Sequence, residues 1–143
     1  MGITHRALLV AVLTTTASCG APESGPDEVR ARSGDLNLSG ANLIGANLSG
    51  LNLSRANLGG ANLGGANLTN ANLTYATLVS AVLTYANLTG ANLSGANLYN
   101  ANLTGANLTG ATLRVGDLTG VNIRCNTSTR WPSGFTPPTC LAP

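Results

Sequence analysis

Side chains that could act as nucleophiles, proton carriers or metal ligands are scarce in this chain of 143 residues. There are three cysteines, no lysine, and a single histidine, His5, which lies in a segment typical of a cleaved signal. The many serine and threonine hydroxyls therefore lack a base, and Asp35 and Asp117 are too few to supply a general acid with a partner base. No group of residues has the spacing of a metal site. The sequence predicts no catalytic site, no metal and no cofactor.

The composition is biased toward alanine, asparagine, leucine, threonine and glycine, whereas aromatic residues make up 3% and charged residues 8% of the chain. Such a bias is typical of a repeat. The formal net charge is +2, so the chain has no bulk field to attract nucleic acid or an acidic partner. We expect no nucleic acid partner.

The amino-terminal segment has the pattern of an export signal. Residues 1–6 carry positive charge, and residues 7–13 form an apolar run too short to span a bilayer. The tetrad 16–19, Thr-Ala-Ser-Cys, resembles the lipobox of bacterial lipoproteins, although Thr16 stands where that motif usually has leucine. The resemblance implies a signal peptide over residues 1–18 and a lipid on Cys19. Secretory cleavage without a lipid, or an uncleaved anchor, are the alternatives.

Lipidation of Cys19 would leave Cys125 and Cys140 as an even pair. An oxidising compartment would let them form a disulfide, which stabilises by up to ~3 kcal/mol in the chain-entropy model, and the alternative is two free thiols. Residues 19–35 are rich in glycine, proline and charge without periodicity, and are predicted to be a flexible linker. A short helical turn over residues 27–33, capping the next region, is the alternative.

Residues 36–125 divide into eighteen blocks of five without an insertion. The central residue is leucine in every block except the last, which has Ile123, and the residue two places earlier is usually alanine. A five-residue step would scatter these leucines around a helix, and on a flat strand it would alternate them between faces. A chain that turns a corner at each block instead directs every central leucine to one interior axis. The period therefore predicts a solenoid.

These blocks closely resemble the motif of the pentapeptide-repeat family, which is Ala, Asp or Asn, Leu and two variable positions. The resemblance implies an all-β fold, a right-handed quadrilateral β-helix with four blocks per coil and about four and a half coils over residues 36–125. It places the leucine and alanine positions inside. Some family members mimic duplex DNA, but that mimicry depends on an acidic surface, and here asparagine occupies the acidic positions.

Residues 126–143 are predicted to be a carboxy-terminal cap closed by the Cys125–Cys140 disulfide. Trp131 and Phe135 lie within that loop, beside prolines that cannot extend a ladder. A solenoid needs such a lid on its last coil, and a pair of aromatics that binds a ligand is the alternative.

With four blocks per coil, residues twenty apart stack on one face. One such face repeats asparagine and a hydroxyl: Asn47, Asn67, Asn87 and Asn107 beside Ser49, Thr69, Thr89 and Thr109. The asparagines could simply bond to each other along the stack. The same face could instead bind ice, ordered water or a glycan, with the outward tyrosines Tyr75, Tyr85 and Tyr99 as further contacts.

Together these patterns predict a non-enzymatic, extracytoplasmic protein that is held to a cell membrane or outer membrane by its lipid, or secreted if no lipid is added. Its expected role is a structural or protein-interaction scaffold. The surface-binding module is the alternative. The sequence identifies neither the protein partner nor the oligomeric state.

Overall fold

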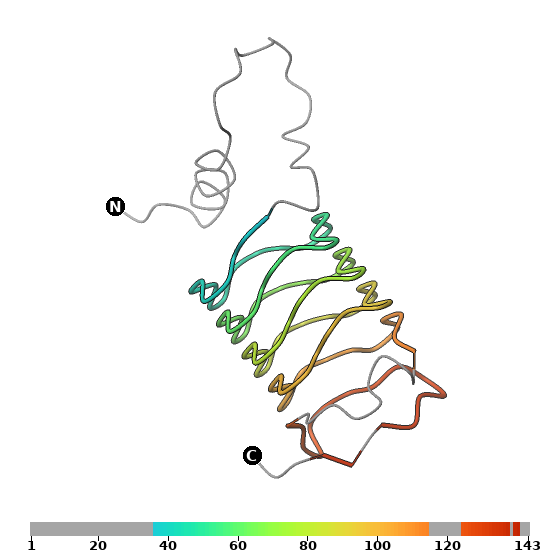
Figure 1. The fold of residues 1–143 in the computed structure, drawn as a ribbon. Helices are drawn as coiled ribbons and strands as arrows, with labels where there is room; N and C mark the ends of the chain where they lie inside the picture. The colour runs from blue at the N-terminus through green and yellow to red at the C-terminus, as the bar shows by residue number, and fades with distance from the viewer. Residues whose placement is uncertain (1–35, 115–123, 138, 141–143) are drawn as a thin grey trace, which may run out of the picture.

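The computed structural model describes residues 36–114, 124–137 and 139–140. These residues form a stack of coils along one axis, beginning with residue 36 at one end and finishing with the carboxy-terminal segment at the other (Figure 1). The predicted signal peptide 1–18, Cys19 and the linker 19–35 lie outside the described residues, as do Asp35 and Asp117. Within the described ranges, no helix is long and apolar enough to cross a membrane.

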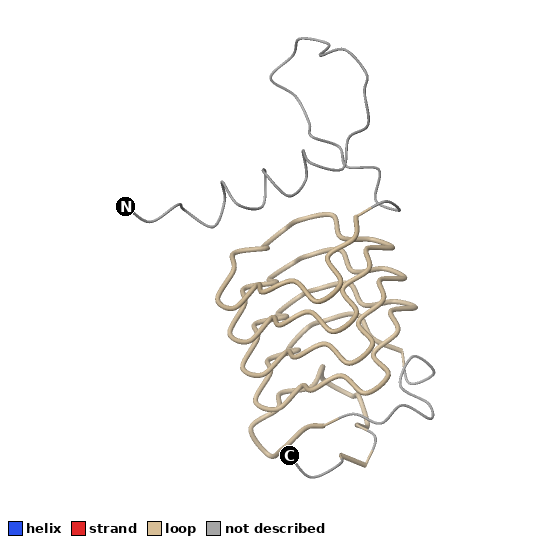
Figure 2. Ribbon diagram, turned by 60° about the vertical axis from the view of Figure 1, so that its left-hand side comes forward, coloured by secondary structure: helices blue, strands red, loops and turns tan. Residues whose placement is uncertain are grey.

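No helix or extended strand occurs within 36–114, 124–137 or 139–140; the coils pair through isolated parallel bridges (Figure 2). Each block contributes one bridging residue and then a turn, so no side of the coil is long enough for a strand. The bridges join residues twenty apart, from Asn37↔Asn57 through Asn92↔Thr112. Four blocks therefore complete one coil, as the family resemblance implies.

The block 86–90 shows how every backbone N–H of a repeat finds an acceptor. Ala86 donates to Leu83 O across the preceding turn, and Asn87 donates to Ala66 O of the coil before it. Leu88 N and Gly90 N donate to carbonyls of the following coil, at 2.8 and 3.0 Å. The N–H of Thr89 points outward and is accepted by the Asn87 side chain at 3.1 Å. Asparagine thus satisfies the one donor that stacking leaves over.

The fifth position of each block from Gly40 to Gly110 has a positive φ, between 55° and 70°. A bond from the first residue of the next block to the preceding central leucine closes each turn, as in Ala41 N to Leu38 O at 3.1 Å. This is the backbone of a type II turn, in which the third residue must be left-handed. Glycine occupies nine of these fifteen positions without strain. Among the others, Tyr75 and Tyr85 adopt the same conformation.

The interior is a column of leucines lined by alanines. Every central leucine from Leu58 to Leu108 is 0% exposed, and the companion alanines from Ala56 to Ala111 are at most 6% exposed. The prediction that these two positions point inward is confirmed. Larger residues at the alanine position, Leu36 and Leu51, lie in the first coil and pack on the same core.

The strict five-residue register predicted through Cys125 is wrong at its last block. Asn102 bridges Arg124 rather than Asn122, and Asn107 bridges Arg130, so the spacing between paired residues grows from 20 to 22 and then 23. The predicted count of about four and a half coils includes residues 115–123, which lie outside the described residues, and stays a prediction. Part of the segment predicted as a cap, up to Arg130, instead pairs with the last coil.

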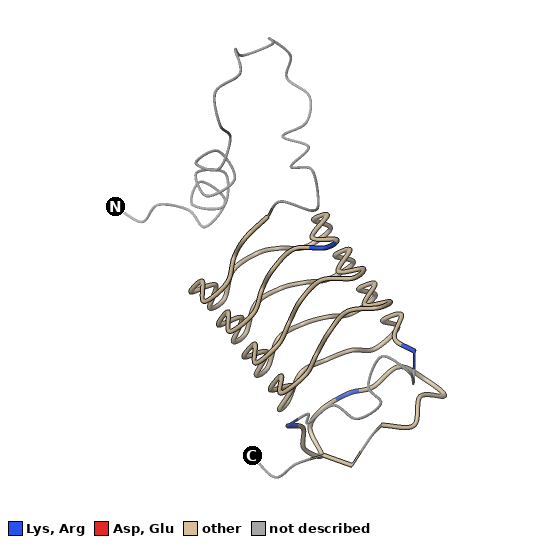
Figure 3. Ribbon diagram, viewed as in Figure 1, with Lys and Arg blue, Asp and Glu red and all other residues tan. Residues whose placement is uncertain are grey.

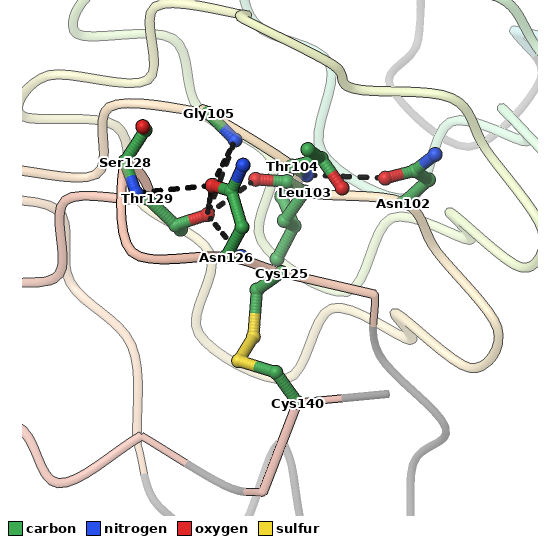
Figure 4. The surroundings of a disulfide bond; sticks show 9 residues. All are labelled: Asn102, Leu103, Thr104, Gly105, Cys125, Asn126, Ser128, Thr129 and Cys140. Carbon is green, nitrogen blue, oxygen red and sulfur yellow. Dashed lines mark hydrogen bonds between the residues drawn. A yellow bond between two sulfur atoms is a disulfide. The ribbon is translucent and has the colours of Figure 1, made fainter. Parts of the chain in front are cut away.

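Side chains of the carboxy-terminal segment finish the ladder (Figure 4). The Gly105 N–H donates to Asn126 Oδ1 at 3.1 Å and approaches Thr129 Oγ1 at 3.2 Å. The buried hydroxyl of Thr129 in turn donates to Leu103 O at 3.0 Å. The predicted disulfide joins Cys125, 2% exposed, to Cys140. It ties the chain end to the segment that pairs with the last coil.

Trp131 and Phe135 stack on each other below this coil. Their ring centroids are 5.4 Å apart with an interplanar angle of 20°. Both rings are partly buried and pack against the leucine core. This is the position of a lid on the open end of the solenoid.

Candidate binding face

The eight residues singled out by their twenty-residue spacing form two parallel columns on one side of the coil. Parallel bridges connect Asn47 to Asn67, Asn67 to Asn87, and Asn87 to Asn107. In each coil the hydroxyl residue lies two positions after the asparagine, and we call each such pair a rung. We call these two columns the polar face: Asn47, Asn67, Asn87, Asn107, Ser49, Thr69, Thr89 and Thr109.

Within each rung of the polar face the hydroxyl and the amide are locked together. The hydroxyl donates to Oδ1 of its own asparagine at 2.7, 2.7, 2.6 and 2.7 Å in the four rungs. The same oxygen accepts the backbone N–H of the hydroxyl residue at 3.1 to 3.2 Å. Because the hydroxyl proton is used, its oxygen is left as an acceptor, while the amide nitrogen keeps its protons. Each rung presents one oriented donor and one oriented acceptor.

The predicted bonding of asparagines along the stack is not the pattern of this face. Among the described residues, one bond joins asparagine amides of successive coils. Asn72 Nδ2 donates to Asn52 Oδ1 of the preceding coil at 3.2 Å, on a neighbouring side of the coil. On the polar face the asparagine oxygens accept bonds from within their own rung instead. The bond to Asn52 Oδ1 shows that the two kinds of contact can coexist, because this oxygen also accepts the N–H and the hydroxyl of Ser54.

Two of the other three sides of the coil are irregular, whereas the third repeats the same pair in three coils, as Asn52, Asn72 and Asn92 beside Ser54, Thr74 and Ser94. Thr77 and Val82 interrupt two asparagine columns, and Thr112 ends a third. At the position of the hydroxyls, the two irregular sides carry Ile44, Tyr99 and several other residue types. Among the described residues, the polar face alone repeats the same pair of groups in four successive coils.

Two exposed tyrosines stand on glycines of the following coil. A Cβ at Gly105 would lie 2.6 Å from ring carbons of Tyr85, and one at Gly95 would lie 2.5 Å from the ring of Tyr75. These contacts hold the rings against the backbone although 71% of Tyr85 and 65% of Tyr75 is exposed. Tyr99 is also exposed. The predicted outward direction of all three is confirmed, but the periodicity did not show that two of them rest on glycine.

Charge is confined to a few arginines in the described part of the chain. Arg55 lies in the first coil, whereas Arg114, Arg124 and Arg130 lie at the carboxy-terminal end (Figure 3). No aspartate or glutamate occurs in residues 36–114, 124–137 or 139–140. Arg130 pairs with Asn107 and so follows the asparagine column. The polar face itself is uncharged.

The geometry defines a class of protein, a solenoid of twenty-residue coils built from pentapeptides. A family model described as pentapeptide repeats, in eight copies, matches segments that together run from residue 37 to residue 124. These matches cover more than half of the chain. The chain belongs to the pentapeptide-repeat family, and the match indicates no catalytic family. In a comparison with curated proteins, the sequence matches none.

Solved structures of the same family resemble this chain. A pentapeptide repeat protein from the cyanobacterium Cyanothece 51142, Rfr23, is 43% identical with a TM-score of 0.61, over 66% of this chain and 63% of that one. A pentapeptide repeat protein from the thylakoid lumen of Arabidopsis thaliana is 36% identical with a TM-score of 0.56, over 64% and 63%. The chain thus matches less than two thirds of either relative's length. This kinship implies a right-handed quadrilateral β-helix.

Proposed function

We propose that this chain is an exported pentapeptide-repeat lipoprotein, held to a membrane by a lipid on Cys19 and acting as a non-catalytic scaffold. In this proposal residues 1–18 are removed, residues 19–35 tether the body, and about four and a half coils form a rigid rod. The related protein of the thylakoid lumen supports a place outside the cytoplasm.

The observation that carries the proposal is the Cys125–Cys140 disulfide. Structural disulfides persist in oxidising compartments and are rare in the cytosol, so the bond favours export. It also uses two of the three cysteines. Cys19 is then the odd cysteine, and it stands directly after the signal-like segment, where the lipobox resemblance places a lipid.

Cell fractionation after metabolic labelling with an alkyne fatty acid tests the anchor. The wild-type chain should carry the label and sediment with membranes, and Cys19→Ala should lose the label and become soluble. The matched control is Cys125→Ala with Cys140→Ala, which removes the other two thiols and should leave label and membrane association unchanged. A Cys19→Ala protein that still sediments with membranes contradicts the proposal.

The uniform polar face favours a second function, binding to an extended surface or polymer such as ice, ordered water or a glycan. Oriented donors and acceptors repeat there at the coil spacing, about 4.8 Å in parallel β-structure. Thermal hysteresis and glycan-array binding by the soluble Cys19→Ala protein test this function. If the protein gives no signal in either assay, the scaffold remains its proposed role. The lack of carboxylates in the described residues speaks against mimicry of DNA.

A further inference from the structure

We infer that Tyr85 and the adjoining rungs of the polar face form a binding site for an extended, neutral polysaccharide. The inference deepens the second function proposed above and is independent of the lipid anchor. It begins from the place of Tyr85 in the coil. This residue directly precedes the rung of Asn87 and Thr89, so it stands at the corner where the polar face starts.

The ring of Tyr85 reaches across two coils. Its Cδ1 and Cε1 both lie 2.6 Å from the position of a Cβ on Gly105, which precedes the next rung, that of Asn107. The same corner carries Gly45 and Gly65 in the two earlier coils. The ring therefore rises from a column that is otherwise glycine, beside two consecutive rungs of the polar face.

The backbone of Tyr85 is in an unfavourable conformation for its residue type. Its φ is +56°, a region that bulky residues rarely adopt. Neighbouring coils use glycine at this corner, so the turn itself does not require a side chain. Residues held in sparsely populated backbone conformations cluster at ligand sites. Here 71% of the residue is exposed, and contact with Gly105 fixes the orientation of the ring.

The chemistry of these groups selects the ligand. An aromatic ring held in place by the backbone stacks on the C–H face of a sugar ring, because the ring face is electron-rich. The amide donors and hydroxyl acceptors of the rungs then match the hydroxyls along a sugar chain. No residue of the polar face is charged, so a neutral polymer suits it better than an anionic one. The repeat along the stack favours an extended chain.

Tyr75 provides a matched control on the same molecule. It has a φ of +57°, is 65% exposed, and its ring rests on Gly95 in the same manner. It stands, however, two corners away from Tyr85, between the shorter asparagine side, with Asn72 and Thr74, and a side that carries Thr77 and Val79. Removing either ring should have the same effect on folding, whereas only Tyr85 adjoins the polar face.

The test is calorimetric titration of the full chain, in a detergent without sugar headgroups, with cellohexaose and with chitohexaose. The wild type should bind at least one of them saturably. Tyr85→Ala should weaken that binding about tenfold, and Tyr75→Ala should leave it within about twofold. Circular dichroism and urea unfolding should be alike for the two variants, which excludes loss of folding as the cause.

Three results would overturn the inference. The first is no saturable binding of either oligosaccharide by the wild type, which leaves the lipid-anchored scaffold to be judged by fractionation alone. The second is an equal loss in the two tyrosine variants. The third uses Thr89→Arg, which blocks the centre of the polar face: if it abolishes binding while Tyr85→Ala does not, the face binds sugar but the assignment of Tyr85 is wrong.

Discussion

Replacing a corner glycine, whose φ is positive, with alanine should lower the free energy of unfolding. The size of the loss should depend on the side chain at the same corner of the preceding coil. At Gly50, where φ is +66°, an added Cβ meets nothing within 4 Å. Gly50→Ala therefore measures the backbone penalty alone, about 1–2 kcal/mol. At Gly95, where φ is +70°, the Cβ would lie 2.5 Å from the Tyr75 ring. Carbon atoms pack best at about 3.5–4.0 Å, so the Tyr75 ring must move away from residue 95.

Displacing the Tyr75 ring should add about 0.5–1.5 kcal/mol to the penalty at Gly95, the usual value of a specific ring contact. Gly95→Ala should thus lower the free energy of unfolding more than Gly50→Ala does, as measured by urea denaturation. In a Tyr75→Ala background the two glycine substitutions should become equal. A coupling below about 0.3 kcal/mol in this double-mutant cycle would refute the claim that the ring rests on the glycine.

Three further perturbations should change stability in urea unfolding. Leu78 is 0% exposed in the middle of the column. Leu78→Ala should lower the free energy of unfolding by about 2–5 kcal/mol, because no second layer can fill the void. A loss under about 1 kcal/mol contradicts an interior column. The Thr104 hydroxyl is buried without a partner, so Thr104→Val should stabilise by about 1 kcal/mol, while Thr109→Val, which loses a 2.7 Å bond, should destabilise by a similar amount. If Thr104→Val instead destabilises and Thr109→Val stabilises, the hydrogen bonding of these two hydroxyls is assigned wrongly. Replacing both Cys125 and Cys140 with serine should lower stability by about 3 kcal/mol, and no change would mean that the disulfide does not constrain the chain.

The resemblance to the pentapeptide-repeat family supplied the four blocks per coil, and with them the column from Asn47 to Asn107. The five-residue period alone was enough to predict a coil with inward leucines. Burial dictates those features, because a period that fits neither helix nor strand leaves few ways to cover so many leucines. The local role of asparagine was not accessible in this way. The family resemblance implies that Asn67 stacks on Asn47, but the choice between a bond along the stack and a bond within the rung depends on side-chain rotamers.

The end of the repeat was predicted less well than its middle. The blocks before Cys125 keep the five-residue pattern, yet Arg124 and Arg130 take the bridging positions. Among the described residues, no further coil pairs with this segment to enforce the register, and the disulfide and the Trp131–Phe135 stack impose their own geometry. Similarly, the sequence indicated that Tyr85 points outward, but its contact with Gly105 depends on a residue twenty positions away.

The central claim is that one coil takes twenty residues, since the polar face and all that is proposed for it depend on this spacing. Disulfide trapping tests it directly. Ser49→Cys with Thr69→Cys places two thiols in successive coils, about 4.8 Å apart along the stack and within the range of a disulfide. Mass spectrometry of unreduced peptides should find that bond after mild oxidation, and should not find one for Ser49→Cys with Thr74→Cys, which lie on different sides of the coil. Equal trapping of both pairs would contradict the coil.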